Sequence, residues 1–317
     1  EVGVGTTVPA GGADVAGDCD DADAAVHPGA VEVADDGKAN GCEGADLVAA
    51  SAEGVFVKAG ASDEAAGTRE DPLGTLSAAV AKAKTDGVAN IFVAAGDVED
   101  TVMVMQDVAV HGGYDPTTWA KGGGRTRLLS SGPVAVRVLE AGLLLNRIEV
   151  YGFSNDGNPS PHLAVSGIVV EDGRASLVDC VLGGGDLQTA LTEGDQATTT
   201  GLWIVDSDVR AVRSRLGSGS PSVAEYSGTG TVERIGAATG ILLESGRLRM
   251  TGGTLGYYGS VELWDIQGTA IAKALVRGLA ATGGHATLAG VDIDGSAETE
   301  VNDTEVTEGT ARSVAEV

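Results

Sequence analysis

An apolar pattern of fifteen residues, repeated five times, restricts the fold of this chain more than any other feature of its sequence. The pattern reads Φ-x-Φ-x4-Φ-x-Φ-x-x-Φ-x-Φ, where Φ is apolar, and its copies start at residues 136, 168, 202, 241 and 279. Of the thirty Φ positions 28 are apolar, whereas about 13 are expected from an apolar content of 43%. Such a repeat predicts short units that bury their apolar side chains by stacking on one another.

Each Φ-x-Φ element predicts a short strand, and the residues between these elements form corners. The chain has 49 glycines and only 3% aromatic residues, which suits tight turns and a core of small aliphatic side chains. Because parallel crossovers are nearly always right-handed, the predicted fold is all-β, a right-handed parallel β-helix or solenoid over residues 91–295. One buried column is predicted to contain Leu145, Leu177, Ala211, Met250 and Leu288.

The sequence before the repeats predicts how the stack begins. Residues 91–95 and a partial copy of the pattern predict the first coil, and the Φ positions of that copy are Met103, Met105, Val108 and Val110. Residues 75–87 predict a helix that begins after Thr75 and ends at Gly87. Its apolar face contains Leu76, Ala79, Val80 and Ala83. We expect this helix to cover the N-terminal end of the solenoid, where strand edges would otherwise be unpaired.

Long excursions separate the copies of the pattern, at residues 151–167, 183–201, 217–240 and 256–278. All four leave from the same corner, so we expect them to form loops on one face of the stack. Aromatic residues of this face or its neighbourhood are candidates for stacking on sugar rings or for a protein interface, or form a satellite core beneath the loops. They are Tyr151, Phe153, Trp203, Tyr226, Tyr257, Tyr258 and Trp264. Of these, Trp203 lies between two inward residues and should therefore point outward.

Both ends of the chain are strongly acidic. Residues 1–46 have a net charge of −10 and residues 292–317 a net charge of −7, out of −26 for the whole chain. No basic face is available for a phosphate backbone, so we do not expect nucleic acid as a partner. Divalent cations are the natural counter-charge, and a solubilising acidic surface is the alternative, most of all for the C-terminal tail.

Residues 14–46 combine closely spaced carboxylates with glycines, a combination that suits a hard cation such as calcium. We expect calcium to fold this segment, because few apolar residues are present to do so. The alternatives are an acidic loop without a specific ion and a transition metal at His27. Cys19 and Cys42 bracket the segment and could form a disulfide, while Cys180 is expected to be a buried free thiol. The candidate metal ligands are Asp18, Asp20, Asp21, Asp23, Glu32 and Asp36.

Two parts of the sequence resemble known families. Residues 67–119 resemble the entry to pectin-lyase-like right-handed β-helix proteins of the exported bacterial type, and the later coils fit that fold to about residue 295. Residues 17–46, with DCDD, VHPGA and a following glutamate, resemble a metal-binding motif proposed in surface proteins of myxobacteria and their relatives. The chain departs from that motif at Val33 or Ala34, where a cysteine is replaced, and in the KANG sequence. The resemblance implies a β-helix and a metal-binding segment.

The predicted organisation is an arm over 1–13, an acidic segment over 14–46, a connecting strand and helix over 47–90, the β-helix over 91–295 and an acidic tail over 296–317. The chain starts at Glu1 rather than at a methionine, and it has no apolar run of 18 or more residues, so we expect no membrane span. We interpret it as an exported protein, extracellular or at the cell surface, with the periplasm as a further location.

Function is predicted as structural, adhesive or assembly-related, with a second copy of the chain or a glycan as partner, for example in a filament or a surface layer. The alternative is a polysaccharide-binding or polysaccharide-degrading protein that uses the looped face. No catalytic residue is assigned. The carboxylate pair of Asp206 and Asp208 and that of Asp292 and Asp294 lie at corners or outward positions that solvation alone explains, so an enzyme is the less favoured reading.

Overall fold

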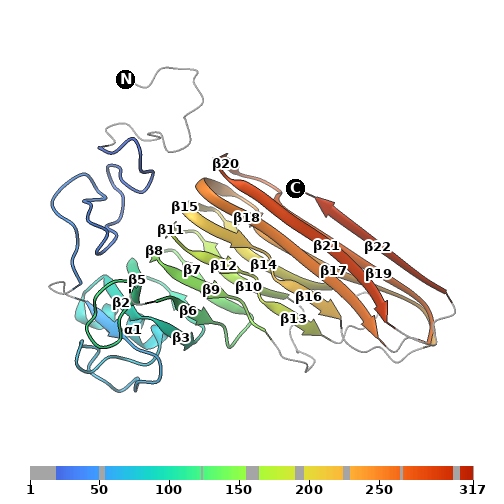
Figure 1. The fold of residues 1–317 in the computed structure, drawn as a ribbon, viewed down its shortest axis with the longest axis horizontal. Coiled ribbons are helices and arrows are strands. Elements are labelled where there is room, and N and C mark those ends of the chain that lie inside the picture. The colour runs from blue at the N-terminus through green and yellow to red at the C-terminus, as the bar shows by residue number, and fades with distance from the viewer. Residues whose placement is uncertain are drawn as a thin grey trace.

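The computed structural model describes residues 19–49, 54–122, 124–154, 164–189, 196–223, 229–264, 267–302 and 308–316. It is mostly β-strand with one described helix, and its parallel sheets curl into a half-barrel (Figure 1). This is the all-β parallel stack that the repeat predicts. No described helix is long and apolar enough to cross a membrane.

The larger sheet has thirteen strands, which contribute two of the three sides of each coil. They are β1 (Val55–Val57), β2 (Asn90–Ala94), β3 (Gly96–Glu99), β5 (Val108–Tyr114), β6 (Thr126–Leu129), β8 (Gly142–Asn146), β9 (Ile148–Tyr151), β11 (Arg174–Val178), β12 (Val181–Gly183), β15 (Ser207–Gly217), β18 (Gly246–Trp264), β20 (His285–Ala289) and β21 (Asp292–Asn302).

The third side is a seven-stranded sheet, and a two-stranded sheet lies beside it. The seven strands are β4 (Val102–Val104), β7 (Val134–Leu139), β10 (Ala164–Glu171), β14 (Gln196–Val205), β17 (Thr229–Leu243), β19 (Gln267–Ala281) and β22 (Glu308–Glu316). The small sheet pairs β13 (Asp186–Thr189) with β16 (Ser220–Val223).

The strand register places equivalent residues of successive coils directly above one another. Leu145 pairs with Leu177, Leu177 with Ala211, Ala211 with Met250, and Met250 with Leu288. The first four of these side chains are at most 1% exposed, and Leu288 is partly buried at the end of the column. The predicted column is therefore confirmed.

The helix α1 (Leu76–Asp86) covers the first coil, where it packs against β1, β2 and β4. Thr75 caps it by accepting a hydrogen bond from the amide of Ala78, and Gly87 ends it in the left-handed conformation with a φ of 71°. Its buried side chains are those that the sequence predicts, Leu76, Ala79, Val80 and Ala83. The predicted limits and apolar face of this helix are confirmed.

Half of the prediction for the inward side chains of the first coil is confirmed, because Val108 and Val110 are buried, but the prediction for β4 was wrong by one residue. Val102 and Val104 point inward and pair with Val136 and Val138, whereas Met103 and Met105 are 53% and 59% exposed. The corner that follows β4 is one residue shorter than in the later coils. A fixed spacing therefore assigns the wrong member of each Val-Met pair, because both members are apolar.

The excursions also differ from the prediction, since their described parts are mainly strand rather than loop. The strand β18 continues to Trp264, and its pairing with β21 runs without a break from Thr254 opposite Asp292 to Trp264 opposite Asn302. A neighbouring strand of matching length satisfies the backbone N–H and C=O groups, so the chain extends the sheet instead of looping out. Tyr226 lies outside the described residues, and only the backbone of Tyr257, Tyr258 and Trp264 is described.

Residues 296–317 were expected to be a tail, but their described parts are strands. The strand β21 reaches Asn302 beside β18, and β22 pairs with β19 from Thr269 opposite Glu308 to Arg277 opposite Glu316. The sheets therefore begin before and end after the predicted limits of 91–295.

Candidate functional site

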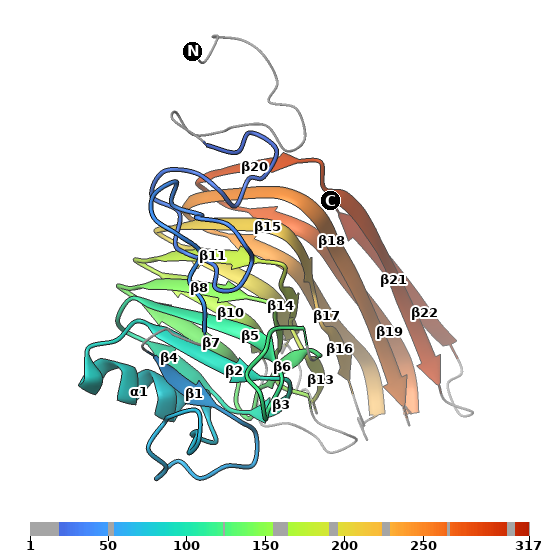
Figure 2. The ribbon, with the colours of Figure 1, turned by 60° about the vertical axis from the view of Figure 1, so that its left-hand side comes forward.

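Residues 19–49, the N-terminal segment, lie on the outer face of the strands β5, β8, β11 and β15 (Figure 2). These strands alternate inward and outward residues, and on four successive coils one outward residue is also apolar. The segment buries that outward stripe, which would otherwise be an exposed apolar patch. The contact consists of Ala24, Ala25 and Val33 over Ala109, Leu144, Val178 and Val212.

An aromatic cluster anchors the other end of the segment. The rings of Phe56 and Phe92 stack with centroids 5.1 Å apart, and Trp119 meets Phe56 edge-on at 4.8 Å. Tyr114 is fully buried, and its hydroxyl donates to Asp35 Oδ2 at 2.8 Å. Burial and the charge of Asp35 raise the pKa of Tyr114. Ala34 and Ala49 of the segment belong to the same buried cluster, so both apolar packing and a hydrogen bond fix the segment to the first coils.

Two basic residues, the buried His111 and the half-buried Lys121, lie under the same segment. The amide of Ala34 donates to His111 Nδ1 at 3.4 Å, and burial lowers the pKa of His111 to about 3, so the ring is neutral. Lys121 donates to the carbonyl of Ala34 and to Asn146 Oδ1, the latter at 2.7 Å. Burial lowers the pKa of Lys121 to about 8.

Ion pairs join the segment to the coils further along the stack. Arg213, in β15, donates to both oxygens of Asp179 at 2.8 and 2.9 Å and to Asp23 Oδ1 at 2.7 Å. Burial alone would raise the pKa of Asp23, but Lys38, the amide of Ala25 and Arg213 outweigh it and lower that pKa to about 2. Asp23 is therefore held as an anion by basic groups from the segment and from the sheet.

Asn40 organises the interior of the segment. It is fully buried and accepts from the amide of Val33 at 2.8 Å, while its side-chain amide donates to Asp36 Oδ2 at 3.0 Å. Its backbone amide donates to Glu32 Oε2 at 3.0 Å. Cys19 and Cys42 are joined by a disulfide with a Cα separation of 5.8 Å. Sequence reasoning missed Asn40, although it is the most buried polar side chain of this acidic stretch.

The predicted metal ligands do not form one cluster. Lys38 places its ammonium 3.1 Å from Asp20 and 2.7 Å from Asp23, and so supplies positive charge between them. Asp21 is exposed, and Asp18 lies outside the described residues. Within the part of the chain that the structure describes, no group of three or more His, Cys, Asp or Glu side chains is arranged to hold a metal ion. The calcium site stays a prediction.

Glu32 and Asp46 have surroundings that suit a cation better. Glu32 Oε1 and Asp46 Oδ1 are buried and have no hydrogen-bond partner among the described residues. The pKa of Glu32 is raised, because burial and the charges of Asp36 and Asp46 outweigh the nearby amides of Gly41 and Asn40. Carboxylate oxygens without donors are the ligands that calcium takes. Asp46 was not among the predicted ligands.

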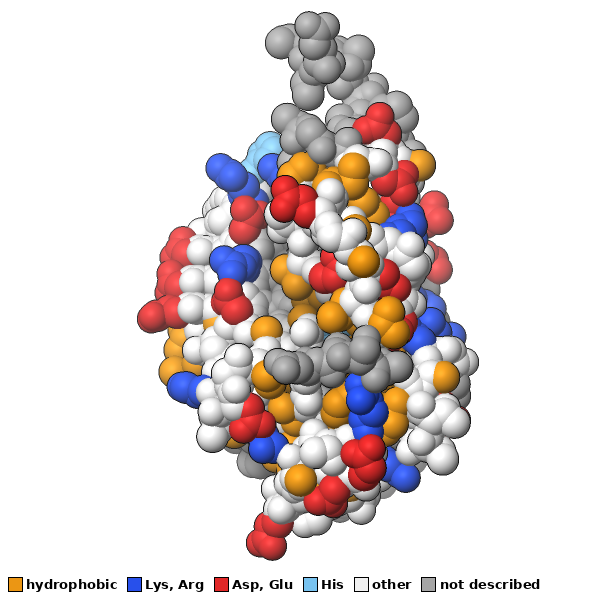
Figure 3. All heavy atoms as spheres, turned by 90° about the vertical axis from the view of Figure 1, so that its left-hand side faces the viewer, with side chains coloured by type: hydrophobic (Ala, Val, Ile, Leu, Met, Phe, Trp, Pro, Cys, Tyr) orange, Lys and Arg blue, Asp and Glu red, His pale blue; other side chains and the backbone are white. Residues whose placement is uncertain are grey.

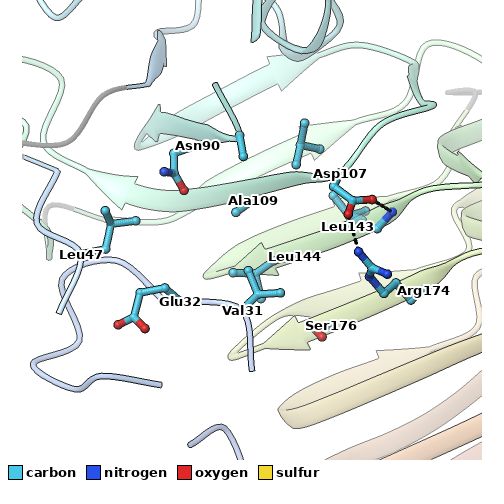
Figure 4. A pocket seen from close by; sticks show the side chains of 13 residues that line it. Val31, Glu32, Leu47, Asn90, Asp107, Ala109, Leu143, Leu144, Arg174 and Ser176 are labelled. Atoms are coloured by element: carbon cyan, nitrogen blue, oxygen red, sulfur yellow. Dashed lines mark hydrogen bonds and ion pairs between the residues drawn. The ribbon is translucent and has the colours of Figure 1, made fainter. Parts of the chain in front are cut away.

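A groove opens between the N-terminal segment and the sheet, and hydrophobic side chains gather along this hollow face (Figure 3). It encloses about 350 Å³, with Val31 and Leu47 on the segment side and Leu144 on the sheet (Figure 4). Arg174 lies at one end and pairs with Asp107. A smaller hollow of about 120 Å³ adjoins it and shares Val31, Leu144, Arg174 and Ser176 with it.

A second cleft, of about 400 Å³, contains two of the predicted aromatic ligands, Tyr151 and Phe153, with Ser130, Ser131 and Glu99. The hydroxyl of Tyr151 donates to Glu149 Oε2 at 3.1 Å. Trp203 is not part of this cleft. It lies on β14 between Val169 and Leu242 of the neighbouring strands, on the outward side as predicted.

The fold and the segment together define a class of protein, a parallel β-stack with a disulfide-closed acidic segment folded onto one outer face. Comparison with protein-family models, curated proteins and solved structures finds no match for the chain.

Proposed function

We propose that this chain is a right-handed parallel β-helix protein of the cell surface or extracellular space that assembles with further copies through the C-terminal end of its stack. The support comes from the difference between the two ends. At the N-terminal end α1 covers the core. At the other end Ile293 is 47% exposed, although Leu255, its equivalent one coil earlier, is fully buried. An exposed core column beside unpaired strand edges favours association.

Charge gives a reason for calcium in this assembly. Residues 292–317 have a net charge of −7, so two such ends repel each other unless cations lie between them. A calcium ion bound to the N-terminal segment beside Glu32 and Asp46 would neutralise the two unpartnered carboxylate oxygens and stabilise that segment. No catalytic step is part of this proposal.

The test uses the chain of residues 1–317 in solution, with calcium and with a chelator. Light scattering measures the mass of the particles that it forms, and electron microscopy shows their shape. We expect dimers in calcium, joined through their C-terminal ends, and monomers after chelation. Ile293→Lys should abolish assembly, whereas Met105→Lys, which changes another exposed apolar side chain, in the first coil, should not. Discrete monomers under all conditions would contradict the proposal. Equal effects of the two substitutions would contradict the proposed location of the contact at the last coil.

The Tyr151 cleft favours glycan binding as a second candidate function. Two aromatic rings beside serine hydroxyls and a carboxylate form the kind of surface on which sugar rings stack. A glycan array, together with reducing-sugar and unsaturated-product assays on acidic polysaccharides, distinguishes binding from cleavage. Loss of array signals in Tyr151→Ala would support this function, and an array without signals for the unaltered chain would remove it.

A further inference from the structure

The groove under Val31 has a buried apolar floor and one apolar wall that remains exposed. Val31 is 46% exposed, an unusual position for a valine whose neighbour Val33 is 2% exposed. Across the groove lie Ala109 and Leu144, outward residues of β5 and β8, and Leu47 closes one end. Clefts of a few hundred Å³ with mainly apolar walls are typical of sites for small molecules.

Basic groups gather at the opposite end of the groove from Leu47. Arg174 lines both the main cavity and the smaller hollow, and Arg210 and His27 line the smaller one. No Asp or Glu is among the described residues that line the smaller hollow, although the chain has a net charge of −26. The described lining of the smaller hollow therefore has basic side chains and no carboxylate, in an otherwise acidic protein.

Arg174 can exchange its present partner. Its ion pair with Asp107 is exposed to solvent, with 66% and 63% of the two side chains accessible, and such pairs contribute little free energy. Arg210, in contrast, donates to the carbonyl of Ala24 and so holds the segment in place. A ligand would therefore place its charge at Arg174 and the hydroxyl of Ser176.

Besides Arg174 and Asp107, the charged residue that lines the main cavity is Glu32, whose carboxylate points away from Arg174 (Figure 4). Its Oε2 accepts the amide of Asn40 and its Oε1 is buried, so the carboxylate belongs to the interior of the segment. The groove is thus polarised, with an apolar body site near Val31 and Leu47 and a cationic head-group site at Arg174.

We propose that this groove binds a small amphipathic anion, a monocarboxylate with an apolar chain of medium length, whose carboxylate is bound by Arg174. The apolar chain lies between Val31 and Leu144. This site goes beyond the proposed assembly and does not depend on it, because the groove is at the N-terminal segment and the assembly contact is at the last coil.

The experiment is calorimetric titration of the full chain with octanoate and, as the cationic counterpart, octylamine, both below micelle-forming concentrations. We expect saturable binding of octanoate at one site and octylamine binding at least about tenfold weaker, since the charged head decides which ligand fits. Arg174→Gln should weaken octanoate binding about tenfold, the loss of one charge-assisted contact. Arg127→Gln is the matched control, because Arg127 forms a similarly exposed pair with Asp97 on β6 and β3, away from the groove.

Asp107→Asn provides an independent variant that keeps Arg174. An asparagine oxygen can still accept the amide of Gly142, which donates to Asp107 Oδ1 at 2.7 Å, while the competing charge is removed. Octanoate binding should become two- to fourfold tighter, in line with the small strength of an exposed pair. The proposal is overturned if octanoate does not saturate, if octylamine binds equally well, or if Asp107→Asn weakens octanoate binding.

Discussion

At the scale of single residues, a polar exception to the apolar repeat shows how buried backbone groups at a corner find hydrogen-bond partners. Ser214 occupies a Φ position and is fully buried. Its hydroxyl donates to the carbonyl of Leu177 or Val212, at 3.1 and 3.0 Å, and accepts from the amide of Cys180 at 3.1 Å. In the sequence this serine is only a missing apolar residue. Its role depends on backbone groups of the neighbouring coil, which the pattern does not contain.

Ser214→Ala is therefore expected to destabilise the protein, because it leaves the buried amide of Cys180 without an acceptor. The expected loss is about 1 to 3 kcal/mol in the free energy of unfolding, measured by chemical denaturation. Ser176→Ala, on the outward side of β11, is the control and should change that free energy by less than about 0.5 kcal/mol. Equal losses for the two variants would show that the hydrogen bond between Ser214 and the amide of Cys180 adds no stability beyond that of an outward serine.

At the scale of elements, the pattern predicts strands and their register but not what covers them. The stripe of Ala109, Leu144, Val178 and Val212 falls on the x positions of the repeat, so the sequence does contain a signal, a run of apolar outward residues in four successive coils. What the sequence does not contain is the direction in which the N-terminal segment folds back. That depends on pairs more than 180 residues apart, such as Asp23 with Arg213.

The attachment of the segment should depend on pH through His111. Burial lowers the pKa of His111 to about 3 in the folded protein, whereas its ordinary value of 6.5 applies to the unfolded chain. As the pH falls, the unfolded chain therefore binds a proton at this residue before the folded protein does. The contribution of this residue to stability is complete above pH 6.5 and is lost as the pH falls from 6.5 toward 3, by about 1.4 kcal/mol per pH unit.

Denaturation at several pH values checks this effect with His111→Gln, which cannot titrate. The difference in unfolding free energy between the unaltered chain and His111→Gln should shift in favour of the variant as the pH falls from 6.5 to 4. The exposed His285, on β20, gives the control, and His285→Gln should follow the unaltered chain. A difference for His111→Gln that is constant with pH would contradict a neutral buried ring.

At the scale of the whole molecule, the excursions change the shape of the stack. The strands β8 and β9 have 5 and 4 residues, and the single strand β18, with 19 residues, runs through the positions of both and beyond them. The sheets therefore widen toward the C-terminal end (Figure 1). A repeat of fixed length predicts a uniform solenoid with loops, and the intervals between copies do not reveal whether the extra residues leave the sheet or lengthen it. The outcome depends on whether the next coil offers a partner of the same length, which is a property of pairs of coils.

The parallel stacking of these coils also determines how the molecule would respond to force. The backbone hydrogen bonds between coils lie across the strands and therefore along the axis of the stack. Tension along that axis would separate one rung after another, each held by a few bonds. Tension along the strands would instead load all bonds of a rung in shear, so the protein resists pulling far better across its stack than along it.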